Sequence, residues 1–151
     1  MRALIQRVAR ARVVVAERVS GEIGIGLLVL LGVTHTDDEP GARWLAGKVA
    51  GLRVFADAAG RMNLDVRDAN GGVLVVPQFT LYGDTRHGRR PEFTEAAHPE
   101  HAAPLIQRFC LSLGEAGLRV EQGVFRAHMS VELINDGPVT LMLETPAKDT
   151  P

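Results

Sequence analysis

Two apolar runs restrict the possible folds of this chain more than any other feature. Residues 26–33 read GLLVLLGV, and residues 73–79 read VLVVPQF. Short, valine-rich runs of this kind predict strands that are covered on both faces, so other layers must pack above and below the sheet. We therefore predict an α/β (α+β) fold, a curled, mixed and largely antiparallel β-sheet or barrel with helices flanking it.

Weaker patterns predict the remaining elements. Partial alternation over Arg2–Val15 predicts a strand, and Glu17–Glu22 has the composition of a turn. The segment Asp37–Pro40 predicts a helix start, because acidic residues and proline suit the first turn, and this helix should end near Arg53. Further strands are expected at 64–66, 118–125, 128–134 and 139–143, with turns at 57–60 and 68–72.

Both predicted helices have an apolar side. The first carries four large residues at helical spacing: Trp44, Leu45, Val49 and Leu52. The second, from His98 to about Gly117, carries Leu105, Ile106, Phe109 and Leu113. Pro104 lies inside it and removes a hydrogen bond, so this helix should either start late or kink.

The composition fits one soluble, cytoplasmic domain spanning residues 1–151. The chain is 46% hydrophobic, and its longest apolar run, Ile23–Val33, is too short to span a membrane. Residues 1–7 do not resemble a signal peptide. The single cysteine, Cys110, excludes an internal disulfide and suits a reducing compartment. The net charge of −1 gives no support for nucleic-acid binding, although 15 of the 17 basic residues are arginine.

Several common chemistries lack their motifs. None of the three serines stands in a Gly-x-Ser-x-Gly context, and there is no phosphate loop or dinucleotide fingerprint. Cys110 falls on the apolar side of the second helix, so it is expected to fill the core. The histidines show only a His98-x-x-His101 pair, which is more typical of solvated surface than of a metal site. We expect no metal and no cofactor.

Two polar segments follow predicted strands. Gln78-Phe79-Thr80 ends the second apolar run, and its N–H groups are either strand caps or a pair of donors for an oxyanion. Gly137-Pro138 lies within Asn-Asp-Gly-Pro, which is either a hairpin turn or the site of a rarer cis peptide. A third candidate, Arg86-His87-Gly88-Arg89-Arg90, is either a solvated loop or a phosphate contact through Arg86, Arg89 and Arg90.

Together these segments resemble the two signature motifs of the D-aminoacyl-tRNA deacylases. The matching residues are 75–81 (VVPQFTL) and 135–140 (NDGPVT), supported by residues 1–8, 24–29, 61–64 and 90–93. The resemblance covers nearly the whole chain. It implies a cytoplasmic homodimer with a barrel-like sheet, which hydrolyses the ester of D-aminoacyl-tRNA, and of mischarged glycyl-tRNA, without a metal.

The resemblance also implies roles for particular residues. Gln78, Phe79 and Thr80 would line the reaction centre, with the Phe79 N–H facing the oxyanion. Gly137-Pro138 would be cis, with its carbonyls entering the partner subunit's active site, beside Arg7. Met129 would lie by the amino-acid pocket. Pro77 replaces the usual serine, and Arg126 replaces a usually small residue, so both bear on substrate range.

The predicted reaction needs no side-chain base. An aminoacyl ester is already activated, and we expect the ribose 2′-hydroxyl of the terminal adenosine to assist, so a tRNA ending in 2′-deoxyadenosine should turn over slowly. A site that selects the D-enantiomer by excluding the L side chain should also accept glycine, which has no side chain. The sequence leaves two rival functions open. Pro77 is compatible with a deacylase for mischarged L-aminoacyl-tRNA, and the Arg86–Arg90 loop is compatible with a non-catalytic RNA-binding dimer module.

Overall fold

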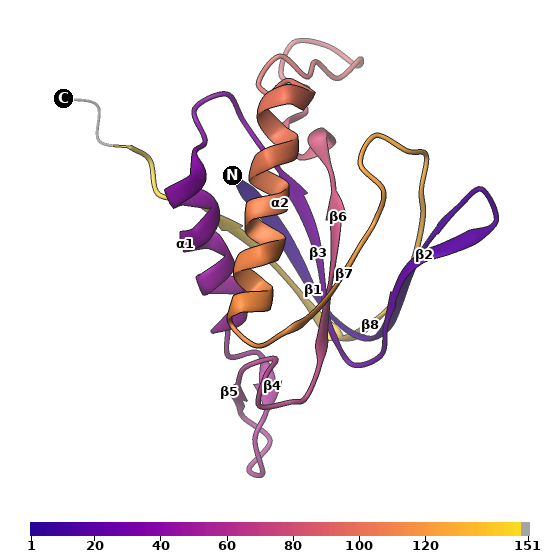
Figure 1. The fold of residues 1–151 in the computed structure, drawn as a ribbon, viewed down its shortest axis with the longest axis vertical. Helices are drawn as coiled ribbons and strands as arrows, with labels where there is room; N and C mark the ends of the chain where they lie inside the picture. Colours follow the sequence, from indigo (N-terminus) through magenta and orange to yellow (C-terminus); the bar gives the residue numbers. More distant parts are fainter. Residues whose placement is uncertain (149–151) are drawn as a thin grey trace.

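The computed structural model describes residues 1–148, which form one curled sheet with two helices against one face (Figure 1). The main sheet has strand order β2-β1-β3-β6-β7, and β8 pairs with the other edge of β1. Its strands are β1 (Arg2–Val15), β2 (Arg18–Ile23), β3 (Gly26–Gly32), β6 (Gly72–Pro77), β7 (Arg119–Gln122) and β8 (Ser130–Glu144). Two short strands, β4 (Phe55–Ala56) and β5 (Met62–Leu64), form a separate hairpin.

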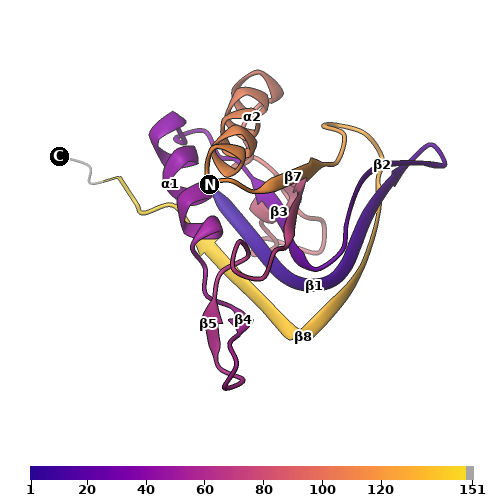
Figure 2. The ribbon, with the colours of Figure 1, turned by 60° about the horizontal axis from the view of Figure 1, so that its bottom comes forward.

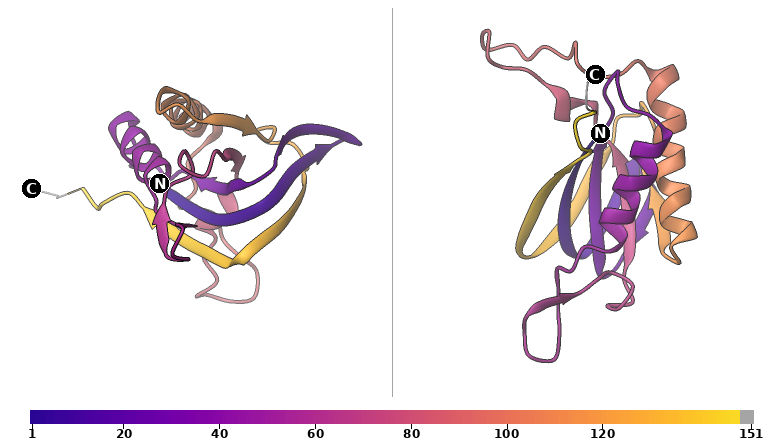
Figure 3. Two further views of the ribbon diagram at one scale, coloured as in Figure 1. Left: turned by 90° about the horizontal axis from the view of Figure 1, so that it is seen from below. Right: turned by 90° about the vertical axis from the view of Figure 1, so that its left-hand side faces the viewer.

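The long strand β1 organises the sheet. Its first half pairs with β3 and its second half with β2, while β8 runs antiparallel along the opposite edge. The pairs β3–β6 and β6–β7 are parallel, so the sheet is mixed, as predicted. The sheet also curls until β2 approaches β7, which the left view of Figure 3 shows from below. A Cβ at Gly21 would lie 2.7 Å from the Gln122 carbonyl oxygen, so this near closure requires glycine in β2.

Helix α1 (Glu39–Ala50) starts where the sequence predicts. Asp38 caps it by accepting a hydrogen bond from the Gly41 N–H at 2.9 Å, and Pro40 lies in the first turn. Leu45 and Val49 are buried against the sheet. Trp44 does not share that face as predicted, because its side chain is 40% exposed and lies beside the Lys48 ammonium.

Helix α2 (Pro99–Glu115) packs beside α1 over the same face of the sheet (Figure 2). It begins at Pro99, so the predicted late start is wrong. Pro104 is accommodated within the helix because it lies on the exposed side. Cys110 fills the core as expected, and burial raises the pKa of its thiol to about 12. Neither helix of residues 1–148 is long and apolar enough to cross a membrane.

Apolar side chains pack on both faces of the sheet. The helices cover one face, where Leu27, Val75 and Phe109 are fully buried. The other face lines the inside of the curl, where Leu28 and Leu74 pack against β1 and the first half of β8. Each such side chain contributes about 1.5–3 kcal/mol by leaving water. The double coverage explains why the residues at 26–33 and 73–76 are apolar at nearly every position.

The structure corrects several of the predicted boundaries. The strand predicted at 64–66 is β5 at 62–64, and α1 ends at Ala50 and not near Arg53. Residues 18–22 form an edge strand and not a turn, because Arg18 and Glu22 point to solvent while Gly21 and Ile23 face the core. The predicted strands 128–134 and 139–143 are one strand, β8. The predicted strand 118–125 ends at Gln122.

Candidate functional site

The chain turns sharply where β6 ends. After Pro77 the backbone enters a short 3₁₀ helix, η1 (Phe79–Tyr82). The Gln78 N–H donates to the Leu31 carbonyl at 2.8 Å, which extends the pairing of β6 with β3 by one bond. Gln78 therefore does not offer the free N–H expected from the sequence. Its side-chain amide instead donates to the Thr80 hydroxyl within the turn.

The far end of η1 is anchored in the protein. Tyr82 is buried, and burial raises the pKa of its hydroxyl. The Arg2 guanidinium lies 4.6 Å from the centre of the Tyr82 ring, and its Nη1 donates to the Leu81 carbonyl at 3.0 Å. These contacts hold the turn in one position relative to β1 and β3.

This turn leaves two backbone donors free. The first N–H groups of a helix have no partner inside it. Within residues 1–148, neither the Phe79 N–H nor the Thr80 N–H donates a backbone hydrogen bond. The Phe79 side chain is 59% exposed, with its ring edge-on to Phe93 at a centroid distance of 5.1 Å. The turn thus leaves the N–H groups of Phe79 and Thr80 available as donors, as the oxyanion interpretation requires.

A cavity of about 800 Å³ opens beside this turn. Its wall is formed by the ends of β3 and β6, the 93–99 segment, the first turns of α2 and the 125–131 segment. Five residues that the sequence linked to the site or its substrate range line it together: Pro77, Gln78, Phe79, Arg126 and Met129. His35, His98 and His128 also line it, and these the sequence did not indicate as neighbours. His101, predicted as solvated surface beside His98, bonds through its ring to the Asp37 carbonyl at 2.9 Å.

The second signature segment is a bulge in β8. The pairs Val8–Asn135 and Gln6–Thr140 enclose only Arg7 on β1 but residues 136–139 on β8. Both flanks of the bulge therefore pair with the same strand, and the predicted hairpin turn at Asn-Asp-Gly-Pro is wrong. The Gly137-Pro138 peptide is cis, as the family resemblance implies.

Side chains brace this bulge from both sides. Arg7 donates from Nε to the Asp136 carbonyl at 2.8 Å and from Nη1 to the Val54 carbonyl at 2.6 Å. Asn135 donates from Nδ2 to the Val139 carbonyl and accepts from the Val139 N–H at 2.8 Å. Gly137 has φ +155°, and a Cβ there would lie 2.6 Å from the Val139 nitrogen, so the position requires glycine.

The bulge exposes acceptors. Gly137 and Pro138 are exposed and have no paired residue in β1, and no described side chain donates to their carbonyls, whereas the carbonyls at 136 and 139 accept from Arg7 and Asn135. Arg7, Gly137 and Pro138 do not line the cavity of their own chain. The chain therefore keeps the turn at Gln78–Thr80 (the donor turn) and the bulge at residues 136–139 (the acceptor bulge) in separate places.

The basic cluster 86–90 lies outside the cavity wall. Arg86 is already paired, because its guanidinium donates to Asp84 and lowers the pKa of that carboxyl to about 2. Arg89 and Arg90 are exposed and make no hydrogen bond or ion pair with residues 1–148. The loop thus presents two free guanidinium groups where the sequence suggested three.

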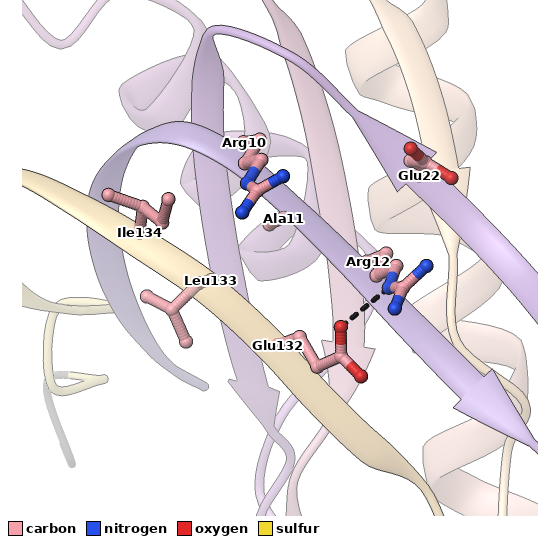
Figure 4. Close-up of a pocket in the computed structure, with 7 residues that line it drawn as sticks. All are labelled: Arg10, Ala11, Arg12, Glu22, Glu132, Leu133 and Ile134. Carbon is pink, nitrogen blue, oxygen red and sulfur yellow. Dashed lines mark hydrogen bonds and ion pairs between the residues drawn. The ribbon is translucent and has the colours of Figure 1, made fainter.

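A second cavity, of about 200 Å³, lies on β1 and β8 (Figure 4). Arg10 and Arg12 project from β1 into it, and Arg12 forms a 2.5 Å ion pair with Glu132. The basic side chains are balanced by Glu22 and Glu132, so this cavity has no clear preference for a charged ligand. Across residues 1–148 no group of three or more His, Cys, Asp or Glu side chains is placed to bind a metal ion.

The sequence is similar to deacylases that act on aminoacyl-tRNA over most of its length. A family described as D-Tyr-tRNA(Tyr) deacylase matches residues 4–144. The chain is 57% identical to the D-aminoacyl-tRNA deacylase of Thermotoga petrophila over 145 residues, covering 96% of this chain and 97% of that protein. It is 59% identical to the one from Anaeromyxobacter dehalogenans, with the same coverage.

Solved structures match the fold as well. The c-Myc DNA unwinding element binding protein superposes with a TM-score of 0.90 at 37% identity, over 97% of this chain and 100% of that one. A probable eukaryotic D-amino acid tRNA deacylase superposes with a TM-score of 0.83 at 18% identity, over 94% and 97% of the two chains. The second likeness is evidence for the fold alone.

Proposed function

The chain belongs to the D-Tyr-tRNA(Tyr) deacylase family, and from this premise we propose how its two signature segments hydrolyse the ester of D-aminoacyl-tRNA. The resemblance predicted from the sequence is confirmed, and so is the enzyme class, a D-aminoacyl-tRNA deacylase. The rival interpretation as a non-catalytic RNA-binding module is not supported by these relatives. One observation carries the proposal: a turn with free N–H donors and a braced bulge with exposed carbonyl groups occur in the same small fold.

The donor turn suits the oxyanion. In ester hydrolysis, negative charge develops on the carbonyl oxygen, and fixed N–H donors stabilise that charge because they need no reorganisation. We assign the Phe79 N–H to this role, with Gln78 and Thr80 forming the rest of the turn. The adenosine 3′ end would occupy the adjacent cavity, beside Pro77 and Met129.

The acceptor bulge suits chiral selection. The carbonyl oxygens of Gly137 and Pro138 can accept hydrogen bonds from the substrate α-ammonium group. Because Arg7 and Asn135 brace the bulge, these oxygens cannot move aside for an L side chain. Glycine has no side chain to reject, so the same site should cleave glycyl-tRNA.

We propose that the two segments meet across a homodimer with two-fold symmetry. In one chain the bulge does not line the cavity, so a second copy is needed to deliver it. Large apolar side chains are exposed near both segments, including Phe79 at 59%, Ile134 at 47% and Met142 at 46%. Exposed apolar residues of this size are typical of surfaces that bind another protein.

Subunit mixing tests the shared site. Gly137→Ala should distort the bulge, because the added Cβ would clash with the Val139 nitrogen. Phe79→Pro should remove the N–H donor of the turn, so each pure variant should be nearly inactive. A one-to-one mixture, unfolded and refolded together, should recover about a quarter of the wild-type rate, because about half of the dimers are mixed and each has one intact site of two. A mixture as inactive as its components would mean that each site lies within one chain.

A substrate panel tests the chemistry. We expect D-tyrosyl-tRNA and glycyl-tRNA to be cleaved by the wild type and L-alanyl-tRNA to be resistant. Release of free amino acid from each labelled tRNA measures this directly. Cleavage of L-alanyl-tRNA would instead favour the second candidate, an L-aminoacyl-tRNA deacylase, for which Pro77 in the cavity wall is the specific observation. Resistance of glycyl-tRNA would contradict selection by rejection.

A further inference from the structure

The main cavity has an unusual charge distribution. The chain has 18 acidic and 17 basic residues, so an average surface contains both signs. Yet no aspartate or glutamate lines this cavity, whereas Arg126 and the three histidines do. Glu95 and Glu100 belong to the segments that form the wall, but their side chains are not part of it. A cavity with cationic and no anionic side chains favours an anionic ligand.

Arg126 is the fixed charge in this wall. Its guanidinium makes no hydrogen bond or ion pair with residues 1–148. Other arginines of the chain are neutralised, as Arg12 is by Glu132 and Arg86 by Asp84. The cavity thus presents an unpaired guanidinium, the group whose planar fork best matches phosphate.

The backbone at Arg126 is unfavourable for any residue other than glycine, asparagine or aspartate. Its φ is +67°, in the left-handed region that a long side chain adopts only at a cost in free energy. Packing does not explain arginine here, because the side chain is exposed. The position therefore combines an unpaired charge with a conformation that glycine would adopt more easily.

The first turn of α2 provides a second, independent source of positive potential. His98 is the N-cap residue and makes no side-chain capping bond, and both His98 and Pro99 line the cavity. The N-terminal end of a 17-residue helix carries a partial positive charge. This end and Arg126 belong to different segments of the wall, so both favour negative charge in the same space.

Aromatic side chains form part of the remaining wall. Phe93 and Phe125 line the cavity, and exposed aromatic rings offer stacking surfaces for a nucleobase. If the reacting ester lies at Phe79, as proposed above, the nucleotide that carries it occupies this cavity. The phosphate on the 5′ side of that nucleotide is then the anion nearest to the wall.

We propose that Arg126 binds the phosphate on the 5′ side of the terminal adenosine, as a specificity-determining contact for the nucleotide end of the substrate. This inference rests on the proposed function. It assigns to this chain a contact that a small residue at position 126 could not make.

Minimal substrates test the contact. The D-tyrosyl ester of adenosine and the D-tyrosyl ester of adenosine 5′-monophosphate differ only in the phosphate. Wild-type protein should show kcat/KM about tenfold higher for the phosphorylated ester, the effect of one charge-assisted hydrogen-bonded pair. Arg126→Gly, which suits the left-handed backbone, should reduce this ratio to about one, and Arg126→Lys should keep part of it.

The matched control is Arg18→Ala, which removes an exposed arginine from β2, outside the cavity. It should leave the ratio at about ten. A ratio near one in the wild type, or a ratio that survives Arg126→Gly, would overturn the inference.

A binding experiment separates this failure from failure of the proposed function. If neither ester is cleaved and D-tyrosyl-tRNA is also resistant, the proposed reaction is wrong. Titration with adenosine and adenosine 5′-monophosphate then still tests Arg126. Tighter binding of the monophosphate that disappears in Arg126→Gly supports the contact, and equal binding of both ligands refutes it.

Discussion

The donor turn after β6 and the acceptor bulge in β8 are opposites in almost every physical respect. The turn presents unpaired N–H groups beside a cavity, and the bulge presents exposed carbonyls away from that cavity. The turn is held by its attachment to a buried parallel pair of strands. The bulge lies on a largely exposed strand and is held by two side chains, Arg7 and Asn135.

This difference shows how a site can be built mainly from main-chain atoms. Apart from proline, which lacks the N–H, every residue supplies the same backbone donor and acceptor, so the reactivity of these groups depends on where the fold places them and on which are left unpaired. A donor stabilises developing negative charge, and an acceptor binds an ammonium group. Each segment supplies one of these functions, and neither supplies both, so the proposed reaction requires them to meet.

The largest effect should come from removing the donor of the turn. Phe79→Pro deletes the N–H while keeping the first position of a helix, where proline is well tolerated. We expect kcat on D-aminoacyl-tRNA to fall by about 10²–10³, the usual loss for one oxyanion donor. Phe79→Leu keeps the N–H and serves as the control. Equal losses in both variants would assign the effect to the side chain and not to the donor.

A smaller effect should come from loosening the bulge. Arg7→Met keeps much of the side-chain volume but removes the bonds to the Asp136 and Val54 carbonyls. We expect kcat/KM to fall about tenfold and the ratio of D- to L-aminoacyl-tRNA cleavage to fall with it, because the acceptors are less well fixed.

Arg12→Met is the matched control on the same strand, since it removes an exposed ion pair with Glu132 that contributes little. A loss of rate with unchanged D/L selectivity in Arg7→Met would show that bracing the bulge does not serve chiral selection.

The sequence predicted the buried parts of the fold best. The run at 26–33 and the helix starts near Asp38 and Pro99 depend on local pattern and burial, and they appear where expected. The run at 73–79 is a buried strand only as far as Pro77, and Phe79 is exposed in η1. The edge strand β2 was missed, because its polar residues at 18, 20 and 22 resemble those of a loop until a neighbouring strand pairs with them. Trp44 was placed on the wrong side because helical periodicity does not fix the width of the buried face.

The candidate site was only partly predictable. The motif residues themselves are contiguous, so a resemblance could identify them. The bulge at 136–139 could not be distinguished from a hairpin, because only the register with β1 shows that both flanks pair with one strand. The convergence of His35, His98 and Arg126 depends on how a strand end, a helix start and a loop meet. No local sequence pattern indicates that these three segments lie next to one another.

The smallest effect should come from the Thr80 hydroxyl. This group accepts a hydrogen bond from the Gln78 side-chain amide, and both residues are at least partly exposed. A neutral hydrogen bond of this kind contributes about 0.5–1 kcal/mol, so Thr80→Ala should lower kcat by about threefold. If the hydroxyl only orients the turn, Gln78→Leu should cause a similar loss, and the double variant should be no worse than either single one. A hundredfold loss in Thr80→Ala alone, restored by serine, would instead place the hydroxyl in the chemical step, and the donor turn would then act through a side chain as well as through its backbone.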